Sequence, residues 1–250
     1  WFARNAVNRV WAWLFGRGIV NPPDDMGPEC PPTRPELLEY LAHELVRSDF
    51  DMRHIYRLIL NSSTYQQSSI PHGDIEVAEA HFACYPIRRL DAEVLVDAVG
   101  GLLAAPVEYS SAIPEPYTYI PATERSIALA DGSISSPVLE MFGRPARDTG
   151  FFSERNNDPT EEQRRYLLNS SEIQRRIERG PRLRRVLEAN KGNPENAVRD
   201  IYIAVLSRPP TAEELAVVGR YAQSGGVTRK QTADDLVWAL INTKEFLYRH

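Results

Sequence analysis

A proline-rich middle segment, in which long helices cannot form, separates two helical regions of this 250-residue chain. Proline lacks a backbone N–H and clashes with the preceding helical turn, so a long helix cannot run through several prolines. The prolines that punctuate the middle are Pro106, Pro114, Pro116, Pro121, Pro137, Pro145 and Pro159. The sequence therefore predicts an irregular, ordered insertion over residues 106–158. Loops of this length in compact domains are usually functional or held by partners.

The residues before this insertion have the spacing of amphipathic helices. In the first helix, apolar side chains recur every three or four residues, at Ala3, Val7, Val10, Trp11 and Leu14. Further helices are expected over TRPELLEYLAHELV (33–46), DMRHIYRLILNSSTYQQS (51–68) and RRLDAEVLVDAVGGLLAA (88–105). Thr33 is the expected N-cap of the first of these, and Asp51 that of the second.

Helical patterns return after the insertion. They cover DPTEEQRRYLLNS, PENAVRDIYIAVL, TAEELAVVGRYAQS and TADDLVWALINTKEFLYR, and the connections SRPP and SGGV are short. Short connections between about five helices favour antiparallel neighbours in a bundle. The sequence thus predicts a mainly α-helical fold, an irregular helical bundle with a long, proline-rich, largely non-helical middle.

The expected organisation has three parts. An N-terminal helical region spans 1–105, the insertion spans 106–158, and a C-terminal helical bundle spans 159–250 and forms one compact unit with 1–105. Within the insertion, Ser136 and Pro137 predict the start of a short helix, SPVLEMF, and a short strand pair is expected around YTYI and SIALA.

A repeated pattern joins an aliphatic pair to Asn and then to Ser or Thr. It occurs in LILNSSTYQQS (58–68), LLNSSEIQRR (167–176) and LINTKEFLYRH (240–250). Two copies match the N-glycosylation signal, but each copy lies at the end of an apolar helical stripe, where an acceptor loop is not expected. Asn and Ser bond to nearby backbone groups. We therefore interpret each copy as a buried junction between helices, with Tyr65, Ile173 or Phe246 returning to the apolar face.

Composition excludes several classes of protein. A net charge of −5 and a pI near 5.6 argue against nonspecific electrostatic binding to nucleic acid or anionic lipid. The apolar runs are far shorter than the ~20 residues of a membrane-spanning helix, so no membrane insertion is expected. Cys30 and Cys84 are too few for a disulfide framework or a thiolate zinc site. They could be bridged or separate.

Motifs of known catalysis or cofactor binding are missing from the sequence. HELVR (43–47) resembles the zinc-protease helix, but Arg47 stands where the second His ligand is required. No nucleophile elbow, phosphate-binding loop, dinucleotide fingerprint or Cys-x-x-Cys-His is present. We expect no metal and no cofactor in this segment, and a non-enzymatic role is favoured.

The densest group of charged side chains lies in EMFGRPARDTGFFSERNNDPTEE (140–162). The candidate ligand-binding residues are Arg144, Arg147, Asp148, Glu154 and Arg155. One interpretation is an anion- or saccharide-binding pocket with Glu154 or Asp148 as acid/base. The other, which we favour, is a salt-bridge network that holds a long loop. A calcium site made by Glu154, Asn156, Asn157 and Asp158 matches no known ligand spacing.

A second charged stretch contains eight arginines between residues 163 and 185. Glu172 and Glu178 alternate with these arginines, which favours solvated helix faces over a nucleic-acid footprint. An acidic partner surface is the alternative.

Several segments together resemble a planctomycete-type domain of unknown function. They are NAVNRVWAWLFGRGIV, RPELLEYLAHELVRSDFDMRHIYRLILNSSTYQQSS, RRLDAEVLVDAV, FGRPARDTGFFSERNNDPT and DLVWALINTKEFLYRH. The resemblance covers nearly the whole chain. It implies the C-terminal region of a large exported protein that often carries a planctomycete-type cytochrome c module, and hence an extracytoplasmic location, periplasmic or at the cell surface. It supplies no activity.

The resulting functional hypothesis is a structural or protein-interaction module. Its expected partners are neighbouring domains of the same polypeptide or another exported protein. The alternative is a saccharide- or anion-binding domain or hydrolase with its site in the 140–158 loop.

Overall fold

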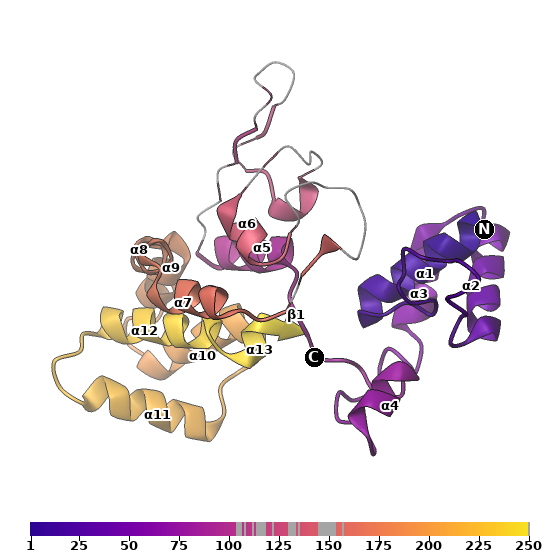
Figure 1. Ribbon diagram of the computed structural model, residues 1–250. Helices are drawn as coiled ribbons and strands as arrows, with labels where there is room; N and C mark the ends of the chain where they lie inside the picture. The colour runs from indigo at the N-terminus through magenta and orange to yellow at the C-terminus, as the bar shows by residue number, and fades with distance from the viewer. Residues whose placement is uncertain are drawn as a thin grey trace. The chain divides into compact units, whose positions relative to one another are not determined.

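The computed structural model describes residues 1–103, 107, 109–111, 113, 119–121, 123–129, 134, 136–144, 154–156 and 158–249. These residues are mainly helical, which confirms the predicted fold class (Figure 1). They divide into two compact units. Unit 1 holds residues 1–88 with Glu154 and Arg155, and unit 2 holds the others. The division falls inside the predicted 1–105 region, and a single compact unit of 1–105 with 159–250 stays a prediction.

Unit 1 contains α1 (Phe2–Phe15), α2 (Pro35–Arg47), α3 (Met52–Leu60) and α4 (Ile75–Ala80). Asp51 caps α3 as predicted, because its carboxylate accepts from the Arg53 amide at 2.8 Å. The predicted cap at Thr33 is wrong. Arg34 occupies the N-cap of α2 and makes no side-chain capping bond, while Pro35 begins the helix. Cys30 and Cys84 are separate thiols.

Aromatic rings fill the core of unit 1 where α1 meets the segment after α4. Trp11 stacks on Phe15 with ring centroids 4.3 Å apart, and Phe82 meets Trp11 edge-on at 5.2 Å. Tyr65 and Tyr85 pack edge-to-face at 5.3 Å beside them. Such offset and edge-on pairs add specific geometry to the burial of large apolar areas, so these rings fix how α1 lies against its neighbours.

A buried asparagine fixes the loop that follows α1. Asn8 is fully buried, and its Nδ2 donates to the Val20 carbonyl at 3.0 Å. Its Oδ1 accepts from the Val20 amide at 2.9 Å. One side chain thus satisfies both backbone groups of a buried residue, as a neighbouring strand would. The close approach also requires Gly18, because a Cβ there would lie 2.1 Å from the Val20 carbonyl oxygen.

Unit 2 is built from short helices and two very short strands. Its elements are α5 (Ala92–Leu103), η1 (Ser126–Ala128), α6 (Pro137–Met141), α7 (Glu161–Asn169), α8 (Ser171–Arg179), α9 (Pro181–Ala189), α10 (Pro194–Leu206), α11 (Ala212–Gln223), α12 (Arg229–Ile241) and α13 (Lys244–Leu247). The strands β1 (Arg88–Arg89) and β2 (Tyr248–Arg249) pair with each other.

The short elements of the middle segment follow the sequence in part. The predicted helix at SPVLEMF is confirmed as α6, and the Ser136 hydroxyl accepts from the Leu139 amide. The strand predicted at SIALA is wrong, because this segment forms the 3-10 turn η1. Tyr119 and Ile120, the described residues of YTYI, are not in a strand. An isolated bridge instead joins Ser111 to Ile134.

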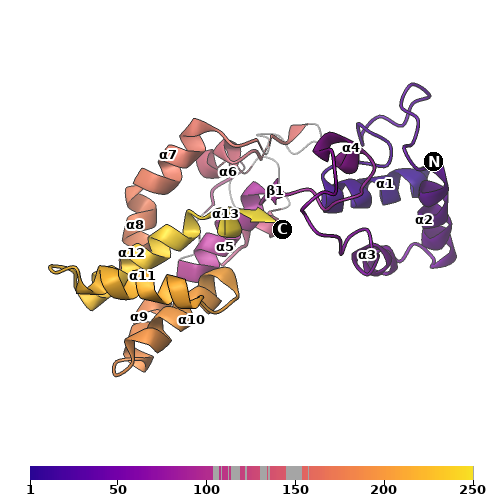
Figure 2. The ribbon, with the colours of Figure 1, turned by 90° about the horizontal axis from the view of Figure 1, so that it is seen from below.

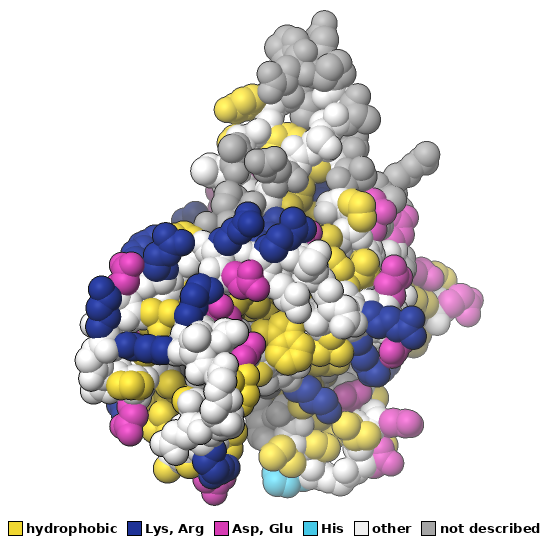
Figure 3. Space-filling view, turned by 90° about the vertical axis from the view of Figure 1, so that its left-hand side faces the viewer, with side chains coloured by type: hydrophobic (Ala, Val, Ile, Leu, Met, Phe, Trp, Pro, Cys, Tyr) yellow, Lys and Arg dark blue, Asp and Glu magenta, His cyan; other side chains and the backbone are white. Residues whose placement is uncertain are grey.

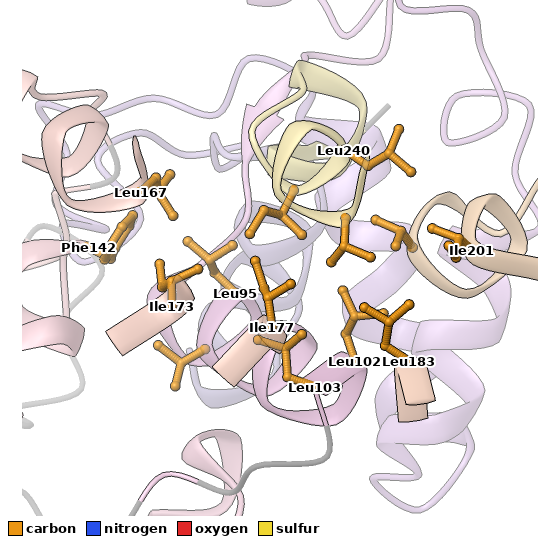
Figure 4. Close-up of a cluster of buried hydrophobic side chains, with 14 of the residues drawn as sticks. Leu95, Leu102, Leu103, Phe142, Leu167, Ile173, Ile177, Leu183, Ile201 and Leu240 are labelled. Atoms are coloured by element: carbon orange, nitrogen blue, oxygen red, sulfur yellow. The ribbon is translucent and has the colours of Figure 1, made fainter. Parts of the chain in front are cut away.

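The core of unit 2 collects an aliphatic stripe from most of its helices (Figure 4). Leu95, Leu102 and Leu103 of α5 belong to one cluster with residues of α7, α8, α9, α10 and α12, namely Leu167, Ile173, Ile177, Leu183, Ile201 and Leu240. These helices are nine to thirteen residues long, too short to be stable alone in water. Their stability therefore comes from this shared burial.

The repeated Asn-Ser/Thr pattern marks helix junctions, as predicted. Asn61 ends α3, Ser170 both ends α7 and caps α8, and Asn242 with Thr243 separates α12 from α13. The polar groups are satisfied locally. For example, Asn242 Nδ2 donates to Trp238 O at 2.8 Å. Ile173 returns to the core, but Asn61 is exposed, so the junctions are less buried than expected.

Replacing Asn8 with alanine should destabilise unit 1, because it leaves the amide and the carbonyl of Val20 buried without partners. Each such group costs about 1–3 kcal/mol, so we expect a loss of roughly 2–4 kcal/mol in the free energy of unfolding. Urea denaturation followed by tryptophan fluorescence measures it, since Trp1, Trp11 and Trp13 all lie in unit 1. Asn5→Ala, the same change on the same helix, is the control. Equal losses in the two variants would contradict this role for Asn8.

Candidate functional site

Arg144, the first of the predicted ligand-binding residues, is buried in unit 2. It follows α6 at a turn where Gly143 has a φ of 102°, and its amide donates to Leu139 O at 2.9 Å. Its side chain is 7% exposed and its Nε lies 3.6 Å from Oε1 of Glu93, which is 8% exposed. One guanidinium nitrogen, Nη1, is buried and has no hydrogen-bond partner among the described residues. Arg144 is therefore enclosed with a carboxylate of α5.

The other predicted residues are not described in unit 2 with Arg144. Arg147 and Asp148 lie outside the described residues. Glu154 and Arg155 belong to unit 1, and each takes part in an interaction. Within the described ranges, no group of His, Cys, Asp or Glu side chains is arranged to hold a metal ion.

A buried arginine that sequence reasoning missed lies beside Phe142. Arg89 is 7% exposed, its guanidinium carbon lies 4.8 Å from the Phe142 ring centre, and it donates to Oε1 of Gln163. Gln163 also caps α7, because its Oε1 accepts from the Thr160 amide at 2.8 Å, and its Nε2 donates to Met141 O at 2.6 Å. Burial lowers the pKa of Arg89. In the sequence, the capping-box pattern that begins at Thr160 could have identified Gln163 as a capping residue.

A second carboxylate of α5 holds part of the middle segment. Asp97 accepts from the amides of Ser126 and Ile127 at 2.7 and 3.2 Å, and Arg125 Nε lies 3.4 Å from it. Tyr109 and Ser126 are joined through their hydroxyls, and burial raises the pKa of Tyr109. Glu93 and Asp97 are four residues apart on one face of α5. This face therefore anchors the described parts of the middle segment.

Unit 2 contains an apolar groove among α10, α11 and α12, with a volume of about 690 Å³. Its floor includes Ala197 and Ile201 of α10 with Ala233 and Leu236 of α12, all buried. Its other wall is α11, through Leu215, Ala216, Val218, Gly219 and Ala222. We call this cavity the α11 groove. No motif in the sequence predicted this groove.

Helix α11 is held by polar contacts near both of its ends, and Val218 in its middle packs against the core. It runs beside α10 and α12 (Figures 1 and 2), yet none of its residues is buried. At its start, Arg208 donates to both carboxylate oxygens of Glu214 at 2.9 Å and to Glu245 of α13 at 2.6 and 2.8 Å. At its end, Gly225 and Gly226 have φ values of 81° and 85°. The hydrogen bond from Tyr221 to Asp235, at 2.6 Å, ties α11 to α12.

The arginine-rich stretch forms the outer surface of α7, α8 and α9, which we call the basic face. Dark-blue side chains form an arc across the side of the molecule shown in Figure 3. Exposed arginines of these helices are Arg164, Arg165, Arg175, Arg179, Arg182, Arg184 and Arg185. Arg164 and Arg165 lie 3.8 and 3.5 Å from the same Glu161. The other five have no ion-pair partner within the described parts of the chain.

These features define a mainly α-helical domain in which Arg144 of the 140–158 segment is buried beside Glu93. The chain belongs to the PSD1 family, described as a protein of unknown function (DUF1553), whose model matches residues 1–222. No curated protein and no solved structure matches the chain. The match confirms the resemblance to a domain of unknown function.

In the part of the chain that the structure describes, no helix is both long and apolar enough to cross a membrane.

Replacing Arg144 with methionine tests whether this residue is structural. The change leaves Glu93 buried without its cation, and breaking a buried pair costs about 3–5 kcal/mol. The double variant Arg144→Met/Glu93→Gln should be less destabilised than the sum of the single changes, as chemical denaturation would measure. Arg125→Met, at an ion pair whose arginine is 72% exposed, should cost less than about 1 kcal/mol. A loss at Arg144 as small as that at Arg125 would contradict a structural role.

The Arg208 bridge predicts a specific pH dependence. The hydrogen bonds from Arg208 lower the pKa of Glu214 from 4.5 to about 2. Because the pKa of Glu214 is lower in the folded than in the unfolded state, its ionisation stabilises the folded state. This stabilisation is complete above the unfolded pKa and is lost as the pH falls towards 2. The difference in unfolding free energy between the wild type and Arg208→Gln should therefore shrink from about pH 5 to about pH 3. Denaturation titrations with Arg199→Gln as control measure it. A difference that grows on acidification would contradict the bridge.

Proposed function

We propose that this domain is a protein-interaction module of a larger extracytoplasmic polypeptide, and that its basic face docks on an acidic surface of a neighbouring domain or another exported protein. The observation that carries this proposal is the segregation of charge. Between residues 164 and 185, eight arginines stand against two glutamates, a local net charge of +6, although the whole chain has a net charge of −5.

The arrangement of these arginines fits a docking surface. Ile173, Ile177 and Leu183 anchor α8 and α9 in the core, so the exposed side chains of both helices are held on a fixed backbone. Arg179, Arg184 and Arg185 are exposed and have no ion pair in the described part of the chain. Opposite charges across an interface steer association and fix its register, more than they add affinity. An acidic protein surface is the partner that such a face fits.

The alternative function, saccharide or anion binding in the 140–158 loop, has less support. A site there needs accessible cations, whereas Arg144 lies in a buried pair with Glu93. We therefore favour the interaction module.

The setting of the parent protein is also a proposal. The resemblance to a planctomycete-type domain implies an exported protein of a kind that often carries a cytochrome c module elsewhere in the polypeptide, and we expect no cofactor in this segment. Fractionation of the source cells with an antibody against this domain tests the location. Recovery from the periplasm or the cell surface supports it, and recovery from the cytoplasm alone contradicts it.

The docking proposal predicts a measurable loss of binding. The domain is titrated with the remainder of its parent polypeptide, produced separately, by isothermal titration calorimetry at low and high salt. The variant Arg179→Gln/Arg184→Gln/Arg185→Gln should bind roughly tenfold more weakly, and wild-type binding should weaken as salt rises, because exposed charges are screened.

The matched control is Arg164→Gln/Arg165→Gln, which changes arginines that share Glu161. It should bind within about twofold of the wild type, as expected for surface charges that are already paired. The proposal fails if the two parts do not associate, or if the triple variant and the control bind equally well.

A further inference from the structure

The α11 groove has the dimensions and lining of a ligand site. Its volume of about 690 Å³ lies within the range of roughly 300–1,000 Å³ that is typical of small-molecule pockets. Three helices line it mainly with aliphatic side chains, and few polar groups take part. A site of this kind binds a ligand with a large apolar part.

Space remains in the groove because α11 presents small residues to it. Ala212, Ala216, Gly219 and Ala222 all line the cavity. A Cβ added to Gly219 would meet no atom within 4 Å. By comparison, α10 buries four residues and α12 buries six, so the surfaces facing α11 belong to the well-packed part of the unit. The hollow is therefore bounded by a firm floor and by a helix that does not fill it.

Polar residues of the groove gather where α11 ends. The chain reverses direction between α10 and α11 and again between α11 and α12, so the end of α11 lies near the starts of both neighbours. Glu195, Arg220, Gln223 and Arg229 line the groove and come from these parts of the helices. Two guanidinium groups thus stand against one carboxylate at this end, which favours an anionic head group.

The two arginines have different roles. Arg229 is held in place, because its guanidinium donates to the carbonyls of Lys191, at 2.6 Å, and Asn190. Arg220 is exposed and has no hydrogen bond or ion pair among the described residues. It is free to turn towards a bound anion. Replacing Arg220 removes a charge without breaking a described contact.

From these contacts we propose that the α11 groove binds a single-chain anionic amphiphile, a long-chain carboxylate. Its apolar chain lies along the floor formed by α10 and α12, and its carboxylate lies at the end that carries Arg220 and Arg229. Helix α11 covers the chain. The Arg208 bridge holds the start of α11, while Gly225 and Gly226 let its end shift to admit the ligand.

The test is calorimetric titration of the full chain with dodecanoate below its micelle concentration. We expect one site per chain and an affinity in the micromolar range. Decanoate, shorter by two methylenes, should bind about fifteenfold more weakly, because each buried methylene contributes roughly a fourfold gain in affinity. Dodecyltrimethylammonium, which has a chain of the same length and the opposite charge, should bind at least tenfold more weakly than dodecanoate.

Variants separate this site from general surfactant binding. Gly219→Leu fills the groove and should abolish binding. Gly101→Leu is the matched control, because Gly101 also lies in a helix with no atom within 4 Å of an added Cβ, and it should leave binding unchanged. Arg220→Gln should weaken dodecanoate about tenfold and remove the preference over the cationic amphiphile.

Each contrary result overturns the proposal. Absence of binding would do so, and would leave the groove to a larger partner such as a helix. Binding at several sites, or binding that Gly219→Leu leaves intact, would show non-specific surfactant association. The variant Arg179→Gln/Arg184→Gln/Arg185→Gln should bind dodecanoate normally, so failure here and failure of the docking proposal are distinguishable.

Discussion

Shared burial of aliphatic stripes is the constraint on which the rest of unit 2 depends. Each helix is short, and α5, α8, α10 and α12 are stable because each places a stripe in one core. Asn, Ser and Thr at the junctions end one helix and begin the next, so the chain can turn without leaving backbone groups unsatisfied. Helix α11 is the exception, since none of its residues is buried. Because α11 does not pack tightly on its neighbours, the α11 groove remains between α11 and the helices α10 and α12.

Buried charge serves the fold in this protein. Glu93 lies beside Arg144, Asp97 holds η1, and Gln163 joins Arg89 to the cap of α7. Burying such groups is costly unless each is paired and hydrogen-bonded. Their effect is to hold irregular backbone against α5 where regular secondary structure is missing. The surface arginines of α7–α9 differ, because five of them have no ion-pair partner in the described part of the chain, and Arg179, Arg184 and Arg185 remain available for docking.

Sequence periodicity predicted the fold class, α6 and the helix junctions, because apolar spacing and capping residues act locally. The partner of Arg144 was not predictable, since Glu93 is distant in sequence and no local rule pairs them. The run of α5 is apolar apart from Glu93 and Asp97, and the sequence does not show which of the two carboxylates pairs with Arg144. The predictions of a cap at Thr33 and a strand at SIALA failed because local propensity competes with tertiary contacts, such as the hydrogen bonds that the η1 amides donate to Asp97. The α11 groove depends on how three helices pack, which no single segment encodes.

Hydrogen exchange of the backbone amides tests the central claim that α11 is tethered at its ends and lies outside the core. Amides of α11 should exchange much faster than those of α10 and α12, because local opening of α11 exposes little buried apolar surface. Added dodecanoate should slow exchange in α11 selectively. Protection of α11 equal to that of α10 and α12 in the free protein would contradict the account.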